Sequence, residues 1–193
     1  MKLLLGTKNQ GKIREFFSLL SDIPGLELLT QRECAFEDVA ERGKAFRENA
    51  LLKARTISAK TGLAVLAEDS GLEVEALGGA PGVRSARFAG EKTTDQQNVQ
   101  KLLKQLESVY ERSARFVCVT VLCFPDGKEL TSQGELRGRI THEPRGTHGF
   151  GYDPVFIPKG YEQTLAELGP TVKDGISHRR RALEQLKETL KLF

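Results

Sequence analysis

The spacing of hydrophobic residues changes repeatedly along this chain between two kinds of pattern. Continuous apolar runs indicate buried strands, which we predict at 2–6, 26–29, 63–67 and 115–124. Apolar residues three or four positions apart indicate amphipathic helices, which we predict at 12–20, 45–60, 94–107 and 178–193. Strands and helices therefore interleave along the whole chain.

This order of elements predicts the α/β class. The turn sequence Pro125-Asp126-Gly127 should connect strand 115–124 to an antiparallel partner at 129–138, which makes the sheet mixed. A loop rich in glycine and proline is predicted at 78–90. The 193 residues contain no internal repeat and no low-complexity linker, so they could form one large domain or two small ones.

Composition and charge narrow the classes of protein that fit. A formal net charge of +3 is too small to indicate binding to nucleic acid or to a membrane surface. No run approaches the roughly 20 apolar residues that span a bilayer. The three cysteines, Cys34, Cys118 and Cys123, lack metal-binding spacing. We interpret them as buried residues in a reducing compartment, which predicts a cytoplasmic protein.

The segment from Gly6 to Lys12 lies between the first predicted strand and the first predicted helix. A glycine there lets the backbone approach a phosphate, and a helix start offers N–H groups and the positive end of a dipole. The segment matches G-x-x-x-x-G-K of a P-loop, but Ile13 stands where that motif has a hydroxyl. The alternative is a polar turn with solvated lysines.

Two adjacent carboxylates, Glu68 and Asp69, follow the predicted strand 63–67 directly. The carboxyl ends of strands are where α/β sheets place ligands, and hard oxygen ligands suit Mg²⁺. A carboxylate there could also deprotonate an attacking water. The alternative is that these acids cap the following turn, and that Glu41 is a solvated loop residue.

Two segments near the C-terminus carry groups that suit a nucleobase. Phe150 and Tyr152 stand beside glycines and Asp153, and aromatic faces stack on bases. Farther on, three arginines at 179–181 open a helix, where they oppose the helix dipole unless an anion or ligand compensates them. The alternatives are aromatic core residues and a solvated basic face.

Taken together, the strings resemble the inosine/xanthosine triphosphate pyrophosphatase family, which removes deaminated purine nucleotides. The resemblance covers nearly the whole chain, and its motifs occur in the family's order: 7–12, 41–43 with 46–50, 67–72, 78–87, 150–154, and Lys173 with 177–179. Each motif alone is weak evidence for the family, but six motifs in the family's order are specific evidence for it.

The resemblance implies a fold and a set of site residues. The fold is a single catalytic domain, 1–193, with a long curved mixed sheet flanked by helices and two lobes around a central nucleotide-binding cleft, usually as a homodimer. Mg²⁺ would be bound by Glu41 and Asp69, with Asp69 also the proton acceptor and Glu68 a support through metal-bound waters. The substrate-binding residues implied are Thr7, Lys8, Asn9, Gln10, Gly11, Lys12, Ser70, Phe150, Gly151, Tyr152, Asp153, Lys173, His178 and Arg179.

The implied reaction is hydrolysis of ITP, dITP or XTP to the nucleoside monophosphate and pyrophosphate, by attack of water at the α-phosphate. Arg179 would donate to the 6-oxo group, which adenine lacks. Leaving a buried polar group unpaired costs about 1–3 kcal/mol, so adenine nucleotides should react more slowly. This pairing does not explain rejection of guanine.

Two other functions stay open from the residues alone. A P-loop ATPase or kinase would use 6–12 with Asp69, although Ile13 is unfavourable. A non-catalytic nucleotide or RNA-binding module would use the lysines and arginines and bind with a steep salt dependence. Adjacent acids would repel phosphate unless a metal is present, which disfavours the second alternative.

Overall fold

The structure, a computed structural model, describes residues 1–191 and contains one mixed sheet of six strands in the order β2-β1-β3-β4-β5-β6. Strand β1 pairs in parallel with β2 and β3, whereas β5 and β6 are antiparallel, so the predicted mixed α/β class is confirmed. The elements are β1 (Lys2–Leu5), α1 (Gln10–Leu20), β2 (Glu27–Leu29), α2 (Phe46–Thr61), β3 (Ala64–Val74), α3 (Asp95–Gln105), β4 (Ser113–Cys123), β5 (Glu129–Ile140), β6 (Phe156–Pro158), α4 (Leu165–Ile176) and α5 (His178–Leu190).

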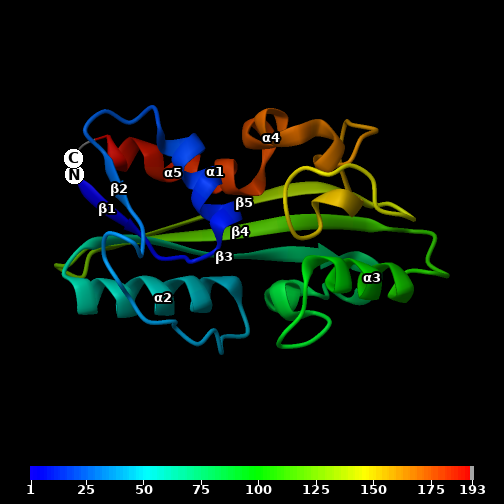
Figure 1. The fold of residues 1–193 in the computed structure, drawn as a ribbon, viewed down its shortest axis with the longest axis horizontal. Helices are drawn as coiled ribbons and strands as arrows, with labels where there is room; N and C mark the ends of the chain where they lie inside the picture. Colours follow the sequence, from blue (N-terminus) through cyan, green and yellow to red (C-terminus); the bar gives the residue numbers. More distant parts are fainter. Residues whose placement is uncertain (192–193) are drawn as a thin grey trace. The chain divides into compact units, whose positions relative to one another are not determined.

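The chain divides into two compact units. Unit 1 contains 1–69, 118–134 and the segment from Arg179 onward, and unit 2 contains 70–117 and 135–178. Within unit 1, α2 lies on one side of the strands and α1 and α5 lie on the other (Figure 1). Within unit 2, α3 and α4 lie on opposite sides of the strands (Figure 1). No helix among residues 1–191 combines the length and apolar character needed to cross a bilayer.

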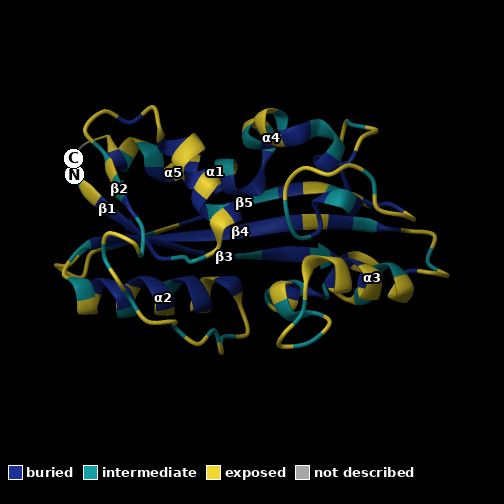
Figure 2. Ribbon diagram, viewed as in Figure 1, coloured by how far each residue is buried: buried dark blue, intermediate teal, exposed yellow. Residues whose placement is uncertain are grey.

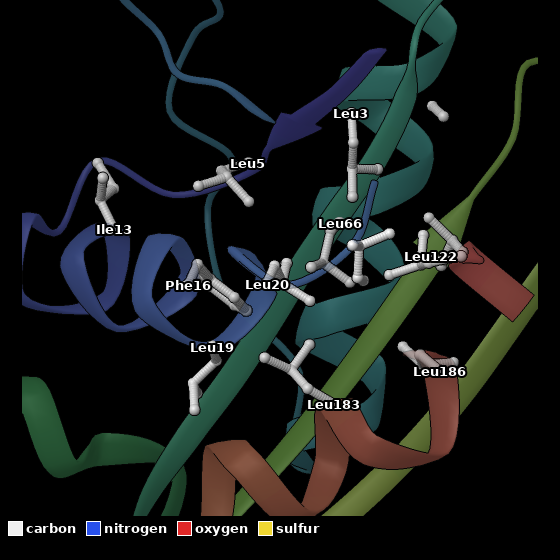
Figure 3. Close-up of a cluster of buried hydrophobic side chains, with 13 residues drawn as sticks. Leu3, Leu5, Ile13, Phe16, Leu19, Leu20, Leu66, Leu122, Leu183 and Leu186 are labelled. Atoms are coloured by element: carbon white, nitrogen blue, oxygen red, sulfur yellow. The ribbon is translucent and has the colours of Figure 1, made fainter. Parts of the chain in front are cut away.

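The core of unit 1 contains the apolar side chains that the helical spacing predicted. Figure 3 shows leucines of β1, β3 and β4 facing Phe16 of α1 and Leu183 and Leu186 of α5. The predicted apolar face of α2 is also buried (Figure 2). Helix α2 ends at Gly62, in a left-handed conformation that glycine favours. Phe17 was expected in this core but is 44% exposed, because Leu19 takes the inward position instead.

Unit 2 has its own core. Leucines of α3 and phenylalanines of β4 and β6 pack together with Tyr152 and Leu165. The buried guanidinium of Arg112 donates to the carbonyls of Leu106, Val109 and Thr141, and so joins the end of α3 to strands β4 and β5. The sequence pattern did not predict β6 or α4.

Strand β3 is longer than predicted, and this changes the position of both acids. The run 63–67 was expected to end before Glu68, but β3 continues to Val74. Side chains along a strand alternate between faces, so Glu68 and Asp69 point to opposite faces of the sheet rather than together from its end. Helix 178–193 was also predicted; α5 ends at Leu190, and residues 192–193 lie outside the described part.

Candidate active site

The segment between β1 and α1 forms the predicted strand–loop–helix arrangement. Asn9 is the N-cap of α1, and its side chain accepts from the N–H of Lys12 at 3.0 Å. The hydroxyl of Thr7 accepts from the N–H of Asn9 at 3.2 Å, which orders the loop. Ile13 is buried in the core of unit 1, so the position that carries the P-loop hydroxyl has a packing role here.

The two lysines of this segment have different surroundings. Lys8 pairs with exposed Asp38 at 2.9 Å, whereas Lys12 pairs with fully buried Glu68 at 3.0 Å. Burial would lower the pKa of Lys12, but the charge of Glu68 outweighs it and the pKa is raised, so Lys12 stays cationic. Gln10 donates to the Lys8 carbonyl, and Gly11 is buried at the helix start.

A buried ionic cluster of Lys12, Glu15, Glu68 and Arg179 fills the face of β3 covered by α1 and α5. Arg179 forms a bidentate pair with Glu68, at 2.6 and 2.8 Å, and its third nitrogen donates to Glu15. The Cys118 thiol donates to Glu68 at 3.0 Å. Burial would raise the pKa of Glu68, but Arg179 and Lys12 hold it well below 4.5.

This cluster corrects two expectations. Glu68 was expected to support a metal beside Asp69, but it points to the other face and binds Arg179 and Lys12 instead. The positive charge of Arg179 opposes the dipole of α5, and a bound anion or ligand was expected to compensate it. Carboxylates of the protein itself, Glu15 and Glu68, do so instead. Contact of Arg179 with a base stays a prediction, and it would require exchange of these bonds.

Asp69 points to the other face of β3, toward α2. Asn49 donates to its Oδ2 at 2.8 Å. One turn farther along α2, Lys53 donates to Glu41 Oε1 at 2.5 Å. Burial raises the pKa of Asp69 above 3.8; Lys53 opposes this shift and the charge of Glu41 adds to it. We call Glu41 and Asp69 the cation pair, for the divalent cation that they would bind; that they bind one stays a prediction.

The donor chemistry of the cation pair fits Mg²⁺. The ammonium of Lys53 lies against Glu41, so the protein itself already places a positive charge next to one of these carboxylates. Mg²⁺ prefers oxygen ligands and commonly takes one or two carboxylates together with waters and substrate phosphates. Within 1–191 no group of three or more His, Cys, Asp or Glu side chains could hold a metal ion.

In unit 2, the predicted base-binding residues form a second polar group. Lys173 of α4 donates to Asp153 Oδ2 at 2.5 Å, and both side chains are buried. The same oxygen accepts from the Phe150 N–H at 2.9 Å, and the Lys173 ammonium lies 4.4 Å from the Phe150 ring centre. Asp153 therefore shapes the turn and orients Lys173. The implied role of Asp153 in substrate binding stays a prediction.

The remaining predicted residues of unit 2 differ in exposure. Tyr152 is buried, and its hydroxyl donates to the Ser85 carbonyl at 2.9 Å, as a core residue would. Its aromatic face is thus part of the core rather than a surface for stacking. The Gly151 N–H donates to Asp95 at 2.6 Å. The His178 ring stacks on Phe116 with centres 4.8 Å apart. Ser70 is half-buried on β3.

Sequence reasoning assigned no role to Asn49, Lys53 or Glu15. Asn49 belongs to the string 46–50 that carried the resemblance, but a polar residue beside an apolar stripe reads as solvent-facing. Asn49 is fully buried and Lys53 is 9% exposed. A buried asparagine and a buried lysine four positions apart on one helix are a signal only once their burial is known.

Comparison with known proteins identifies the family of the chain. The model of the Ham1 family matches residues 3–189. The chain is 48% identical to the dITP/XTP pyrophosphatase of Bacillus licheniformis, over 98% of this chain and 97% of that protein. It is also 48% identical to the dITP/XTP pyrophosphatase of Bdellovibrio bacteriovorus, over 98% of each.

Solved structures give the same result. A HAM1 protein from Coxiella burnetii superimposes with a TM-score of 0.91 at 42% identity, over the full length of both chains. The Ham1 protein of Staphylococcus aureus follows with a TM-score of 0.88 at 38% identity, over 99% of this chain and 98% of that one. The chain therefore belongs to the Ham1 family.

Proposed function

We propose that the chain is a Mg²⁺-dependent nucleoside triphosphate pyrophosphatase. It hydrolyses ITP, dITP and XTP to the nucleoside monophosphate and pyrophosphate, and so removes noncanonical purine nucleotides from the nucleotide pool. The single observation that carries this proposal is the cation pair: the buried carboxamide of Asn49 donates to Asp69 and accepts from the Gly43 N–H, two residues from Glu41. The names of the relatives support the substrate class.

In this function Asp69 accepts the proton of the attacking water. Asn49 holds one of its oxygens in place through a hydrogen bond. Bound Mg²⁺ would neutralise phosphate charge and polarise the α-phosphate. Water adds to the α-phosphorus, the bond to the bridging oxygen breaks, and pyrophosphate leaves.

The first segment of the chain would bind the triphosphate. Residues Thr7 to Lys12 place a helix N-terminus and two lysines there, and the positive end of the α1 dipole favours anions. Ser70 is assigned to the substrate as well. Lys53, which the sequence did not single out, is a further cation beside Glu41.

The residues of unit 2 would bind the base. Phe150 is the half-buried aromatic of the set and is assigned the stacking role. Asp153 and Lys173 contact Phe150, and Tyr152 supports the turn from the core. Gly151 and His178 are assigned to the substrate by the resemblance. Arg179, which belongs to unit 1, is assigned to the 6-oxo group by the resemblance alone.

A turnover assay tests the proposal. The protein is incubated with Mg²⁺ and ITP, XTP, dATP or dGTP, and the phosphate product is identified. We expect pyrophosphate from ITP and XTP. Asp69→Asn should lower kcat by a factor on the order of 10²–10⁴, the usual contribution of a positioned acid or base.

The control is Asp22→Asn, which changes an exposed aspartate of the same unit paired with Lys187. It should turn over ITP as the unchanged protein does. Release of orthophosphate in place of pyrophosphate would favour the P-loop ATPase alternative. Salt-sensitive nucleotide binding without turnover would favour the binding module.

We further propose a cytoplasmic homodimer. Cys34, Cys118 and Cys123 are all free, as in a reducing compartment. The resemblance to a family of homodimers supports the assembly. Sedimentation velocity across protein concentrations tests it, and a single monomeric species at all concentrations would contradict it.

A further inference from the structure

The side chain of Asn49 joins the two halves of the cation pair. It is fully buried, and both ends of its carboxamide are hydrogen-bonded. The Nδ2 donates to Asp69 Oδ2 at 2.8 Å, and the Oδ1 accepts from the Gly43 N–H at 2.8 Å. Asp69 stands on β3, whereas Gly43 lies two residues from Glu41 in the loop before α2.

The partners of Asn49 leave only one orientation for its amide. A carboxylate can only accept and a backbone N–H can only donate, so the nitrogen must face Asp69 and the oxygen must face Gly43. An aspartate at this position could not donate to Asp69, and a leucine of similar volume could satisfy neither partner. The amide is thus the group that this place requires.

The loop that carries Glu41 depends on the first turn of α2. The Lys44 N–H donates to the Glu48 carboxylate at 2.8 Å, next to the bond from Gly43 to Asn49. Gly43 fits closely, since a Cβ there would lie 2.7 Å from Asn49 Oδ1 and 2.8 Å from Glu48 Cβ. Glu41 therefore has a fixed position relative to Asn49.

We infer that Asn49 is a positioning residue that assembles the cation pair, by holding Asp69 and the Glu41 loop with one carboxamide. This rests on the proposed function, because it assumes that the pair binds a divalent cation. Asn49 acts through Asp69 and Glu41 and is assigned no contact with substrate. Its loss should weaken cation binding more than it weakens nucleotide binding.

Binding of Mn²⁺, followed by electron paramagnetic resonance in the absence of nucleotide, measures this directly. Mn²⁺ shares the preference of Mg²⁺ for oxygen ligands. We expect Asn49→Ala to raise the Mn²⁺ dissociation constant roughly 10–100-fold, the usual effect of removing a group that orients a metal ligand. The Mg²⁺ concentration for half-maximal hydrolysis of ITP should rise in parallel, while KM for ITP at saturating Mg²⁺ stays the same.

Asn98 provides a matched control. It is also buried on a helix, and its carboxamide also joins two groups, accepting from the Ala89 N–H at 2.8 Å and donating to the Ala86 carbonyl at 3.2 Å. Asn98→Ala should lower the melting temperature as Asn49→Ala does, but leave the Mn²⁺ dissociation constant unchanged. Equal losses of Mn²⁺ affinity in both variants would overturn the inference.

A second variant applies if Asn49→Ala does not fold. Gly43→Ala leaves the bond between Asn49 and Asp69 intact but forces the Glu41 loop away from Oδ1. It should also weaken Mn²⁺ binding, whereas Gly175→Ala, at a glycine with open space around it, should not. Unchanged Mn²⁺ affinity in Gly43→Ala would contradict the inference.

Asp69→Asn separates failure of this inference from failure of the proposed function. If Asp69→Asn binds Mn²⁺ as tightly as the unchanged protein, the cation pair itself is wrong. If Asp69→Asn loses Mn²⁺ and Asn49→Ala keeps it, the pair is right and only the role of Asn49 is wrong.

Discussion

At the scale of single residues, the buried carboxylate of Glu68 lies against two cations, Arg179 and Lys12. Glu68 has no exposed surface, yet its pKa lies well below the ordinary value because Arg179 and Lys12 outweigh the effect of burial. Removing one partner of such a group leaves uncompensated charge in the interior, which costs far more than the loss of an exposed pair. Glu68 is thus a structural charge, although its place in sequence suggested a role with the metal.

Replacement of this carboxylate tests that view. Glu68→Gln should lower the free energy of unfolding by about 3–5 kcal/mol, because Arg179 and Lys12 lose their buried partner. Urea unfolding followed by circular dichroism measures it. Glu184→Gln, which removes the exposed partner of Arg180, should cost less than about 1 kcal/mol. Equal effects of the two changes would contradict a buried role for Glu68.

The stability of the unchanged protein and that of Glu68→Gln should also depend differently on pH. The pKa of Glu68 is lowered by folding, so its contribution to stability is complete above its ordinary value of 4.5 and is lost as pH falls through the folded-state value. The stability difference between the unchanged protein and Glu68→Gln should therefore shrink on acidification below 4.5. A constant difference across this range would be inconsistent with an ionised Glu68.

At the scale of elements, helix α4 is broken where Lys173 must be positioned. Gly169 has φ 78° and ψ 176°, and Pro170 follows it, so residues 165–168 and 170–176 are separate helical segments. This backbone region is open essentially to glycine alone. The break determines the direction of the second segment, which carries Lys173 to Asp153.

Substitution of Gly169 tests whether the break in α4 requires a glycine. Gly169→Ala should destabilise the protein by about 1–3 kcal/mol, because alanine is strained in that conformation. Gly175→Ala is the matched change in the same helix, where there is open space and ordinary backbone, and it should be neutral or stabilising by up to about 1 kcal/mol. Thermal and urea unfolding compare the stability of the two variants. Equal stability would contradict the view that alanine is strained in the backbone conformation of residue 169.

At the scale of the whole molecule, the proposed roles divide between the two units. The ionic cluster and the cation pair make their described contacts inside unit 1, whereas Lys173, Asp153 and Phe150 make theirs inside unit 2. Substitutions at Phe150 and at Glu41 should therefore each alter one kinetic quantity without altering the other.

Kinetics of one variant from each unit test this division. Phe150→Ala removes the proposed stacking ring, and because stacking is worth about 1–3 kcal/mol per base, KM for ITP should rise roughly tenfold to a hundredfold. The Mg²⁺ concentration for half-maximal activity should not change. Glu41→Gln should raise the Mg²⁺ concentration for half-maximal activity and leave KM for ITP unchanged. Phe17→Ala, which removes an exposed aromatic of α1, should change neither quantity. A shift of both quantities in either site variant would argue against the division.

The local properties of this protein were determined by the sequence itself. Apolar periodicity identified α1, α2, α3 and α5 and the strands β1 and β4, because burial of one face imposes that spacing on any chain. Gly62 ended α2 as expected. The residue types of the loop from Gly6 to Lys12 also indicated phosphate chemistry, whereas Glu41 was assigned to a cation only through the resemblance.

Which polar side chains pair with one another was decided only by the tertiary structure. Glu68 and Asp69 are neighbours in sequence, but the continuation of β3 sends them to opposite faces, where α1 and α5 supply cations to one and α2 supplies an amide to the other. Burial of Asn49 and the break at Gly169 were equally invisible in the sequence, because both depend on contacts with distant segments. Periodicity reports which side of an element is buried, and only the fold determines which polar groups meet there.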